Sequence, residues 1–177
     1  MNRLTVDEFK QEEKTPLVVV LDNVRSLNNV GSVFRTADAF LLESIYLCGI
    51  TSIPPHPEIH KTALGAEDAV DWKYFENTEE ALTVLKAKKY TIFAIEQAKG
   101  SISLQDLTLE KGRRYAVILG NEVKGVQQNI VDMCENCIEI PQYGTKHSLN
   151  VSVSGGIVIW DFFKKIASPS PPEGGNV

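Results

Sequence analysis

The sequence lacks any apolar stretch long enough to cross a membrane, because none approaches the ~18 residues that a spanning helix requires. Its first residues, MNRLTVDEFKQEEK, contain no apolar core followed by a small-residue cleavage site, so a secretory signal is not predicted. We therefore expect a protein of the reducing cytoplasm that has no membrane partner.

Cysteine is scarce. Cys48, Cys134 and Cys137 are the three cysteines of the chain, and an odd, sparse set excludes a disulfide framework. Cys134 and Cys137 form a C-x2-C pair, but a structural zinc site needs four ligands, usually with a second pair. His147 and Cys48 are the loose candidates for the missing ligands. We favour incidental thiols and predict no metal site.

Basic charge is in deficit, since 18 Lys and Arg stand against 23 Asp and Glu and the net charge is -5. This balance argues against a uniformly basic nucleic-acid-binding face, so a polyanionic partner must meet a local basic cluster. Apolar residues make up 43% of the 177 residues. A chain of this size and composition suits one packed domain that needs no disulfide or metal for stability.

Three common motifs are also missing. No GxGxxG follows the first apolar run, and neither GxxxxGK[ST] nor GxSxG occurs. Their absence removes the dinucleotide fingerprint, the usual phosphate-cradling loop and the nucleophile elbow of a Ser-His-Asp hydrolase.

Strand and helix patterns alternate along the chain. The run LVVVL at 17–21 is continuous and β-branched, which is typical of a strand buried on both faces. A capping box of Thr5 and Glu8 begins a helix over 3–13, and Thr78 is expected to cap a helix over 79–89. Further strands are predicted at 44–50, 72–75, 90–95, 114–119 and 137–140, and further helices at 30–41, at 59–69 with a break near Gly65, and at 126–133.

This alternation predicts an α/β fold, with a mainly parallel sheet that carries helices on both faces. Ligands of such sheets bind at the carboxyl ends of the strands. One segment resists the pattern, because NVSVSGGIVIW at 150–160 has the alternation and β-branched content of a strand, whereas 160–166 reads as helix. Disagreement between local preference and fold often marks a functional region.

Two polar segments follow predicted strands. GNEVKG at 120–125 has the composition of a simple turn, and its two glycines are a weak signal by themselves. Arg35 lies beside Phe34 in an otherwise apolar helix. A guanidinium in such a place needs a carboxylate or phosphate partner. A purely structural role for Arg35 would be a salt bridge to Glu122. Ser148 and Asn150 are equally compatible with capping a helix.

Taken together, NNVGSVFRTADAF, YAVILGNEVKGV and IEIPQYGTKHSLNVSVSGGIVIW resemble the three signature motifs of the SpoU (TrmH) family of RNA ribose 2'-O-methyltransferases, in the SPOUT superfamily. KTALGAEDAV at 61–70 is also similar to a family segment. The resemblance covers roughly residues 16 to 165. It implies a methyltransferase domain at 16–167, preceded by the N-terminal helical segment at 1–15. The composition of SPSPPEGGNV predicts a disordered tail at 168–177.

The resemblance implies the SPOUT fold, in which the C-terminal segment is threaded into a deep trefoil knot, a documented exception to the rule that chains are unknotted. Small residues at 150–160 would allow close backbone passage there. It also implies that S-adenosyl-L-methionine binds in the knot, that the protein is a homodimer, and that each active site is built across the interface. The implied reaction is methyl transfer to a ribose 2'-hydroxyl of RNA.

Site residues follow from the resemblance position by position. The implied catalytic set is Asn29, Arg35, Glu122, Ser148 and Asn150. The implied cofactor contacts, many through the main chain, are Leu119, Gly120, Ile140, Pro141, Leu149, Ile95 and Glu96. Arg35 is expected to anchor the target phosphate and polarise the hydroxyl, and Glu122 to orient Arg35 or a neighbouring Asn. Val123 replaces the Gly that usually follows the motif-two Glu, which puts the loop shape in question.

Several interpretations remain open. A tRNA substrate is favoured because SLNVSVSGG resembles the tRNA ribose-methylating branch; rRNA is the alternative. Two alternatives come from other functional classes. One is a catalytically silent RNA-binding protein of the same fold. The other is a different nucleotide-binding α/β protein, in which GNEVKG is only a turn. RNA would be gripped by a basic patch drawn from Arg25, Arg35, Lys61, Lys124, Lys146 and His147.

Overall fold

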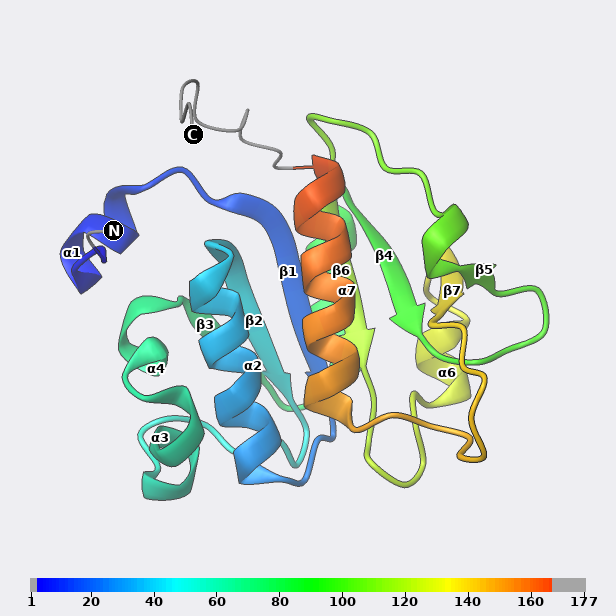
Figure 1. The fold of residues 1–177 in the computed structure, drawn as a ribbon, viewed down its shortest axis with the longest axis horizontal. Helices are drawn as coiled ribbons and strands as arrows, with labels where there is room; N and C mark the ends of the chain where they lie inside the picture. Colours follow the sequence, from blue (N-terminus) through cyan, green and yellow to red (C-terminus); the bar gives the residue numbers. More distant parts are fainter. Residues whose placement is uncertain (1–2, 167–177) are drawn as a thin grey trace, which may run out of the picture.

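The computed structural model describes residues 3–166, which form one seven-stranded sheet with helices on both of its faces (Figure 1). The strand order is β3-β2-β1-β6-β4-β7-β5, and every neighbouring pair is parallel. The predicted α/β class is therefore confirmed. The tail predicted at 168–177 lies outside the described residues.

The elements alternate along the chain as expected. The strands are β1 (Thr15–Asp22), β2 (Leu42–Cys48), β3 (Trp72–Phe75), β4 (Tyr90–Ile95), β5 (Ile102–Ser103), β6 (Arg114–Leu119) and β7 (Asn136–Glu139). The helices are α1 (Val6–Gln11), α2 (Leu27–Ala39), α3 (Pro57–Ala63), α4 (Ala66–Ala69), α5 (Thr78–Ala87), α6 (Gln128–Val131) and α7 (Val151–Ile166), with a 3-10 turn at Leu104–Asp106. The two-residue β5 and the 3-10 turn were not predicted, because neither is long enough to show a period.

Strand β1, between β2 and β6, is buried on both faces, as its continuous β-branched run predicts. Leu17, Val19 and Leu21 join the core beneath α2 and α7, whereas Val18 and Val20 join the core beneath α5 and α6. In Figure 1, α2 and α7 lie in front of the sheet and α6 lies behind it. Two apolar cores therefore hold the sheet from both sides.

The segment 150–160 is helical, which corrects the strand preference of its sequence. It forms the start of α7, which packs on α2 and across β1 and β6. Val158, Ile159 and Phe162 are fully buried at helical spacing. Burial of one helical face outweighs the β preference of Val and Ile, since propensities span only ~1 kcal/mol.

Helix starts are close to the predicted positions. The Thr5–Glu8 capping box is present at α1. For α5 the cap is Asn77 instead of Thr78: the Asn77 side chain accepts a hydrogen bond from the Glu80 amide, and the Thr78 hydroxyl donates to buried Asp22 at 2.6 Å. The predicted break near Gly65 is confirmed, because Gly65 has a φ of 97° and separates α3 from α4.

The chain takes an unusual return path after β6. It passes through α6 behind the sheet, runs along β7, and then crosses beneath the sheet to α7 in front (Figure 1). The crossing segment, residues 140–150, leads into the C-terminal segment that the predicted trefoil knot would thread. The knot itself stays a prediction.

No helix within residues 3–166 is both long and apolar enough to cross a membrane. In that same part of the chain, His, Cys, Asp and Glu side chains nowhere gather in threes as a metal site would require. The thiols of Cys134 and Cys137 have raised pKa values, mainly because they are buried.

Candidate functional site

A cavity of about 240 Å³ opens at the carboxyl ends of β4, β6 and β7. Three chain segments form its walls: the end of β4, the loop after β6, and the crossing segment with the first turns of α7. Six of the seven residues predicted to contact the cofactor line it, namely Ile95, Glu96, Leu119, Gly120, Ile140 and Leu149. Pro141, the seventh, is next to Ile140 in the chain but is not among the lining residues.

The predicted catalytic residues divide into two groups. Glu122 and Ser148 line the cavity. Asn29 is buried behind Glu122, while Arg35 and Asn150 point elsewhere and are exposed. A single chain therefore brings together only part of the predicted catalytic set.

The GNEVKG segment is a tight turn, and the turn shapes the cavity. The Asn121 and Gly125 backbones exchange two hydrogen bonds, of 3.1 and 2.9 Å. The Asn121 side chain accepts from the amides of Val123 and Lys124, both at 3.0 Å. Gly120 has no room for a side chain, because a Cβ there would lie 2.3 Å from the Gly125 carbonyl carbon. The turn interpretation is thus correct, and the turn is at the same time a cavity wall.

Glu122 joins this loop to the start of α2. Its carboxylate accepts hydrogen bonds from the amides of Arg25 and Ser26, at 3.0 and 2.9 Å, and from the Asn29 side chain at 3.2 Å. Burial by itself raises the pKa of Glu122, but these hydrogen bonds outweigh it and place the pKa below its usual value. At neutral pH the charged carboxylate is therefore a fixed link between two loops 93 or more residues apart.

Arg35 does not make the salt bridge to Glu122 that we considered. Its side chain is exposed, and within residues 3–166 it has neither an ion pair nor a hydrogen bond. The physical reason is the helical stripe of α2: Val30, Val33 and Phe34 point into the core, and Arg35 falls outside that stripe. The guanidinium is therefore free to meet an external anion.

Asn150 caps α7, which is the helix-capping role that its sequence also allowed. Its side-chain oxygen accepts from the Ser152 amide at 2.9 Å, the Val153 amide at 3.3 Å and the Ser152 hydroxyl at 2.7 Å. Ser148 instead stays exposed at the cavity. Asn150 thus sets where the helix begins, and Ser148 is the member of the pair placed to touch a ligand.

Several lining residues were not predicted as site residues. Val151 and Ser154 were missed because their segment was read as a strand; helical periodicity from 151 onward was the signal available. Lys124 and His147 were expected only as phosphate contacts. The remaining unpredicted lining residues are Gln97, Asn121, Val123, Gly125, Ile138, Glu139 and Gln142.

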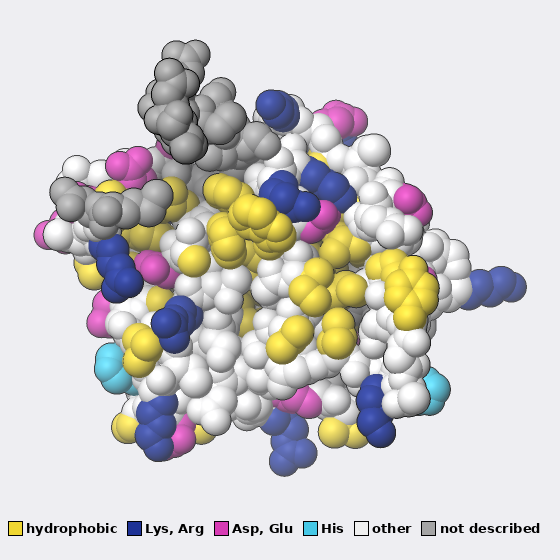
Figure 2. All heavy atoms as spheres, viewed as in Figure 1, with side chains coloured by type: hydrophobic (Ala, Val, Ile, Leu, Met, Phe, Trp, Pro, Cys, Tyr) yellow, Lys and Arg dark blue, Asp and Glu magenta, His cyan; other side chains and the backbone are white. Residues whose placement is uncertain are grey.

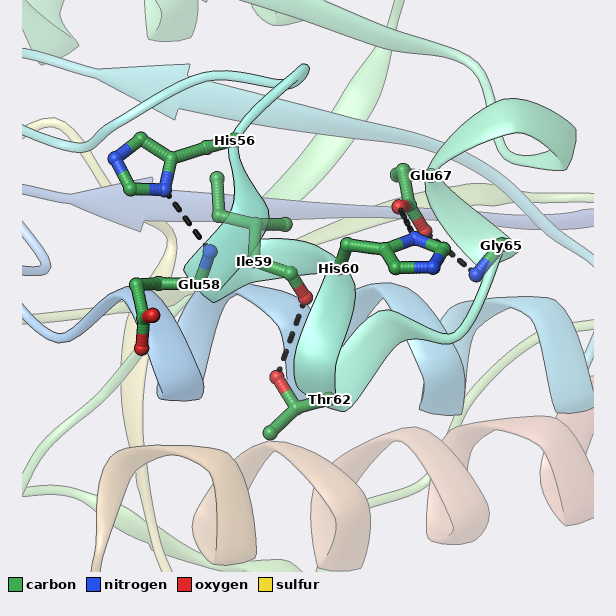
Figure 3. Close-up of polar contacts among 7 residues, drawn as sticks. All are labelled: His56, Glu58, Ile59, His60, Thr62, Gly65 and Glu67. Atoms are coloured by element: carbon green, nitrogen blue, oxygen red, sulfur yellow. Dashed lines mark hydrogen bonds and ion pairs between the residues drawn. The ribbon is translucent and has the colours of Figure 1, made fainter.

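The KTALGAEDAV segment supports the site from outside. Figure 3 shows α3 and α4 with the Thr62 hydroxyl directed at the Ile59 carbonyl and the His60 ring against Glu67, at 2.5 Å. The Thr62 hydroxyl also donates to the Asn28 carbonyl in α2, at 2.9 Å. This segment therefore holds the N-terminal end of α2, and the lining residues of the cavity do not include it.

The basic residues proposed for a patch are mostly exposed. Arg25, Lys124 and Lys146 project into solvent near the strand ends, and Lys61 is engaged with Glu58 at 2.6 Å. Figure 2 shows Lys and Arg side chains spaced along the lower edge, where the strands of Figure 1 end. Exposed positive charges thus lie along the edge of the sheet where the cavity opens, in a protein that is acidic as a whole.

The chain is similar to known proteins and matches a family profile. The profile of the SpoU rRNA Methylase family matches residues 16–160. A 23S rRNA (guanosine-2'-O-)-methyltransferase of Nitrosomonas europaea, RlmB, is 32% identical over 150 residues, which cover 84% of this chain and 56% of that protein.

Two solved structures are also similar. The AdoMet-bound rRNA methyltransferase from Sinorhizobium meliloti superposes with a TM-score of 0.77 at 29% identity, over 89% of this chain and 58% of that one. The TrmH/SpoU tRNA modifying enzyme of A. aeolicus gives a TM-score of 0.79 at 26% identity, over 90% of this chain and 80% of that one. The chain spans less than two thirds of the Nitrosomonas and Sinorhizobium relatives. Because the family profile covers nearly the whole sheet and all three cavity-forming segments, this protein belongs to the SpoU rRNA Methylase family.

Proposed function

We propose that this protein transfers a methyl group from S-adenosyl-L-methionine to a ribose 2'-hydroxyl of RNA. The observation that carries the proposal is the cavity, because six predicted cofactor contacts and two predicted catalytic residues meet there although they come from three separate parts of the chain. The Sinorhizobium relative, whose structure contains AdoMet, supports the cofactor.

The cavity lining suits that cofactor chemically. Ile95, Leu119 and Ile140 offer apolar surface for an adenine ring, and the Glu122 carboxylate is also among the lining residues. When bound, the cofactor supplies an electrophilic methyl group on a positively charged sulfur. Backbone groups of the turn that begins at Gly120 line the cavity and would hold polar edges of the ligand.

The role proposed for Arg35 requires a second protomer. Arg35 lies outside the cavity of its own chain, yet α2 shares the front layer of the molecule with α7 (Figure 1). The outward side of α7 carries Val153, Ile157 and Trp160, which are 38–50% exposed at helical spacing. Apolar side chains gather on this face in Figure 2. A homodimer through this face would bury them and would bring Arg35 of one protomer toward the cavity of the other.

In that arrangement each residue has a chemical task. The Arg35 guanidinium anchors the phosphate beside the target ribose and polarises the 2'-hydroxyl; it is a poor base, so the proton leaves with help from the substrate phosphate. Glu122 fixes the loop geometry through Asn29 and the start of α2. Ser148 lines the cavity and contacts the reacting groups. By holding the RNA phosphate and the loop beside the cavity, these residues would position the hydroxyl against the bound cofactor, which is the main source of rate increase for such a transfer.

We propose tRNA as the preferred substrate, with rRNA as the alternative. Both kinds of enzyme occur among the relatives, since the A. aeolicus protein modifies tRNA and the Nitrosomonas protein methylates 23S rRNA. The SLNVSVSGG segment favours tRNA by resemblance. An RNA substrate also fits a cytoplasmic location.

Two measurements test the proposal. Isothermal titration calorimetry with S-adenosylmethionine should show saturable binding, and the absence of heat at millimolar cofactor would rule out the cofactor. Transfer of radiolabelled methyl to bulk tRNA and to rRNA should then show label on ribose, with tRNA the better acceptor. Cofactor binding without transfer to either RNA would instead support the catalytically silent RNA-binding alternative.

A further inference from the structure

Glu96 ties the end of β4 to the loop that follows β6. One carboxylate oxygen accepts a hydrogen bond from the Val126 amide at 3.0 Å, and the other accepts from the Gln97 amide at 3.2 Å. Val126 ends the Gly120–Gly125 turn, 30 residues further along the chain. The Glu96 side chain is therefore a link between two walls of the cavity.

The turn is shaped to receive this carboxylate. Gly125 has a φ of 66°, and a Cβ on it would lie 2.3 Å from the Glu96 oxygen that binds Val126. Any side chain at position 125 would therefore displace Glu96 as well as strain the backbone. The glycine and the carboxylate fit each other as a pair.

Glu96 also stands between two hollows. It lines the cofactor cavity, and on its other side it lines a second hollow of about 580 Å³ beneath α6; Gln97 and Lys124 line both. Val126 lines the second hollow, so the Glu96–Val126 hydrogen bond joins a residue that lines both hollows to one that lines the second. Val126 is only 7% exposed, so without that contact its amide would lose its acceptor in a largely buried position.

We propose that Glu96 is a positioning residue that latches the Gly120–Val126 loop against β4 and so sets the width of the cofactor cavity. This inference rests on the proposed function, because it takes the ligand of the cavity to be S-adenosylmethionine. Glu96 acts through the loop, so an acceptor oxygen at this position matters and its negative charge does not.

Substitutions at Glu96 separate these two roles. Glu96→Gln retains one oxygen that can accept from Val126 and loses only the acceptor of the neighbouring Gln97 amide, so it should bind S-adenosylmethionine within about twofold of the wild type. Glu96→Ala removes the acceptor and should weaken binding about tenfold, which corresponds to about 1.4 kcal/mol. Calorimetry measures both, and amide hydrogen exchange in the cofactor-free protein should show faster exchange at Val126 for Glu96→Ala alone.

A double-mutant cycle tests the pairing with Gly125. Gly125→Ala should weaken cofactor binding at least tenfold in the wild type and by a smaller factor in the Glu96→Ala background, where the clashing carboxylate is gone. Gly112→Ala is the matched control, because Gly112 also has a positive φ, 84°, but a Cβ there would meet nothing within 4 Å among the described residues. It should leave cofactor affinity unchanged.

The outcomes are distinguishable. If wild-type protein does not bind S-adenosylmethionine, the proposed function fails. If the wild type binds and Glu96→Ala binds equally well with Val126 still protected, the latch is wrong and the function stands. A Glu96→Gln variant as weak as Glu96→Ala would show a direct charge contact with the ligand instead. If Glu96→Ala does not fold, the other two variants still test the proposal. A Glu96→Gln variant that binds S-adenosylmethionine more weakly than Gly125→Ala does would overturn the proposed positioning role of Glu96.

Discussion

Glu122 and Arg35 belong to the same predicted site, but the structure holds Glu122 by hydrogen bonds and leaves Arg35 exposed. Glu122 is held by three hydrogen bonds at the start of α2, where the positive end of the helix dipole also favours a carboxylate. Arg35 is left in solvent one helix face away. A fixed carboxylate suits a structural link, and a free guanidinium suits an external phosphate.

The Glu122 link should be visible in the pH dependence of stability. Its folded pKa is lowered, so its contribution is fully present above the usual value of 4.5 and is lost as pH falls through the folded pKa. Glu122→Gln should lower the free energy of unfolding by about 1 kcal/mol at pH 7, by analogy with loss of a helix cap, and by less at pH 3.

Denaturant unfolding at the two pH values measures this difference. Glu76→Gln is the control, because Glu76 is exposed and has no hydrogen bond or ion pair within the described part of the chain. A Glu122→Gln penalty that is equal at both pH values would contradict the link.

Substitution of Arg35 should separate catalysis from stability. Arg35→Ala removes an exposed side chain, so the free energy of unfolding should change by no more than about 0.5 kcal/mol and cofactor affinity should not change. Methyl transfer to RNA should fall by at least ~100-fold, because a preorganised cation is lost. Arg113→Ala, just before β6 at the opposite edge of the sheet, should keep full activity. Unchanged transfer by Arg35→Ala would remove its assigned role.

At the scale of elements, close contacts between helices and strands position the site. Gly31 lets α3 press against α2, and Gly155 lets α7 press against β6, where a Cβ would lie 2.9 Å from Leu119. The first contact anchors the end of α2 that Glu122 binds. The second places α7 beside the cavity, so that Val151 and Ser154 line it.

The α2–α3 contact gives a stability prediction. A Cβ at Gly31 would lie 2.3 Å from the Ile59 carbonyl oxygen and 2.1 Å from the Thr62 hydroxyl. Because the obstacle includes backbone, Gly31→Ala should destabilise the fold by about 1–3 kcal/mol despite the better helix propensity of Ala. Gly156→Ala in α7, which meets no described atom within 4 Å, should instead gain about 0.5–1 kcal/mol. Thermal unfolding of both variants measures the contrast, and similar melting temperatures would refute it.

At the scale of the whole molecule, the apolar side of α7 leads to a prediction about assembly. Ile157→Glu places a charge in the stripe proposed as the dimer face, so light scattering should show a monomer with wild-type circular dichroism, and RNA methylation should be lost. Thr83→Glu, exposed on α5 behind the sheet, should remain dimeric and active. A wild-type protein that is monomeric and still turns over would contradict the shared active site.

RNA affinity should fall steeply as salt is added. The protein as a whole is acidic, so binding depends on local cations that contact phosphates and release counterions. The logarithm of RNA affinity should fall linearly with the logarithm of salt concentration. Lys146→Ala should reduce that slope by about 0.7–0.9, the contribution of one phosphate contact, whereas Lys88→Ala on the far side of the sheet should not. Fluorescence titrations at several salt concentrations measure the slopes, and a salt-independent affinity would exclude the basic patch.

The sequence by itself determined most of the fold. Continuous β-branched runs such as LVVVL, separated by amphipathic helices, admit few arrangements other than a parallel sheet covered on both faces, because each apolar face must be buried. The three motifs could also be recognised in the sequence, so six of the residues that line the cavity and the turn at GNEVKG were predicted from the sequence.

Only the tertiary structure decided the rest. Whether 150–160 is helix or strand depended on the surface available at β1, β6 and α2, and not on the preferences of its own residues. The bonds from Glu122 to α2 and from Glu96 to Val126 join segments 30 to 97 residues apart. No local pattern encodes such a partner, because hydrogen bonds between loops depend on where the folded strands end.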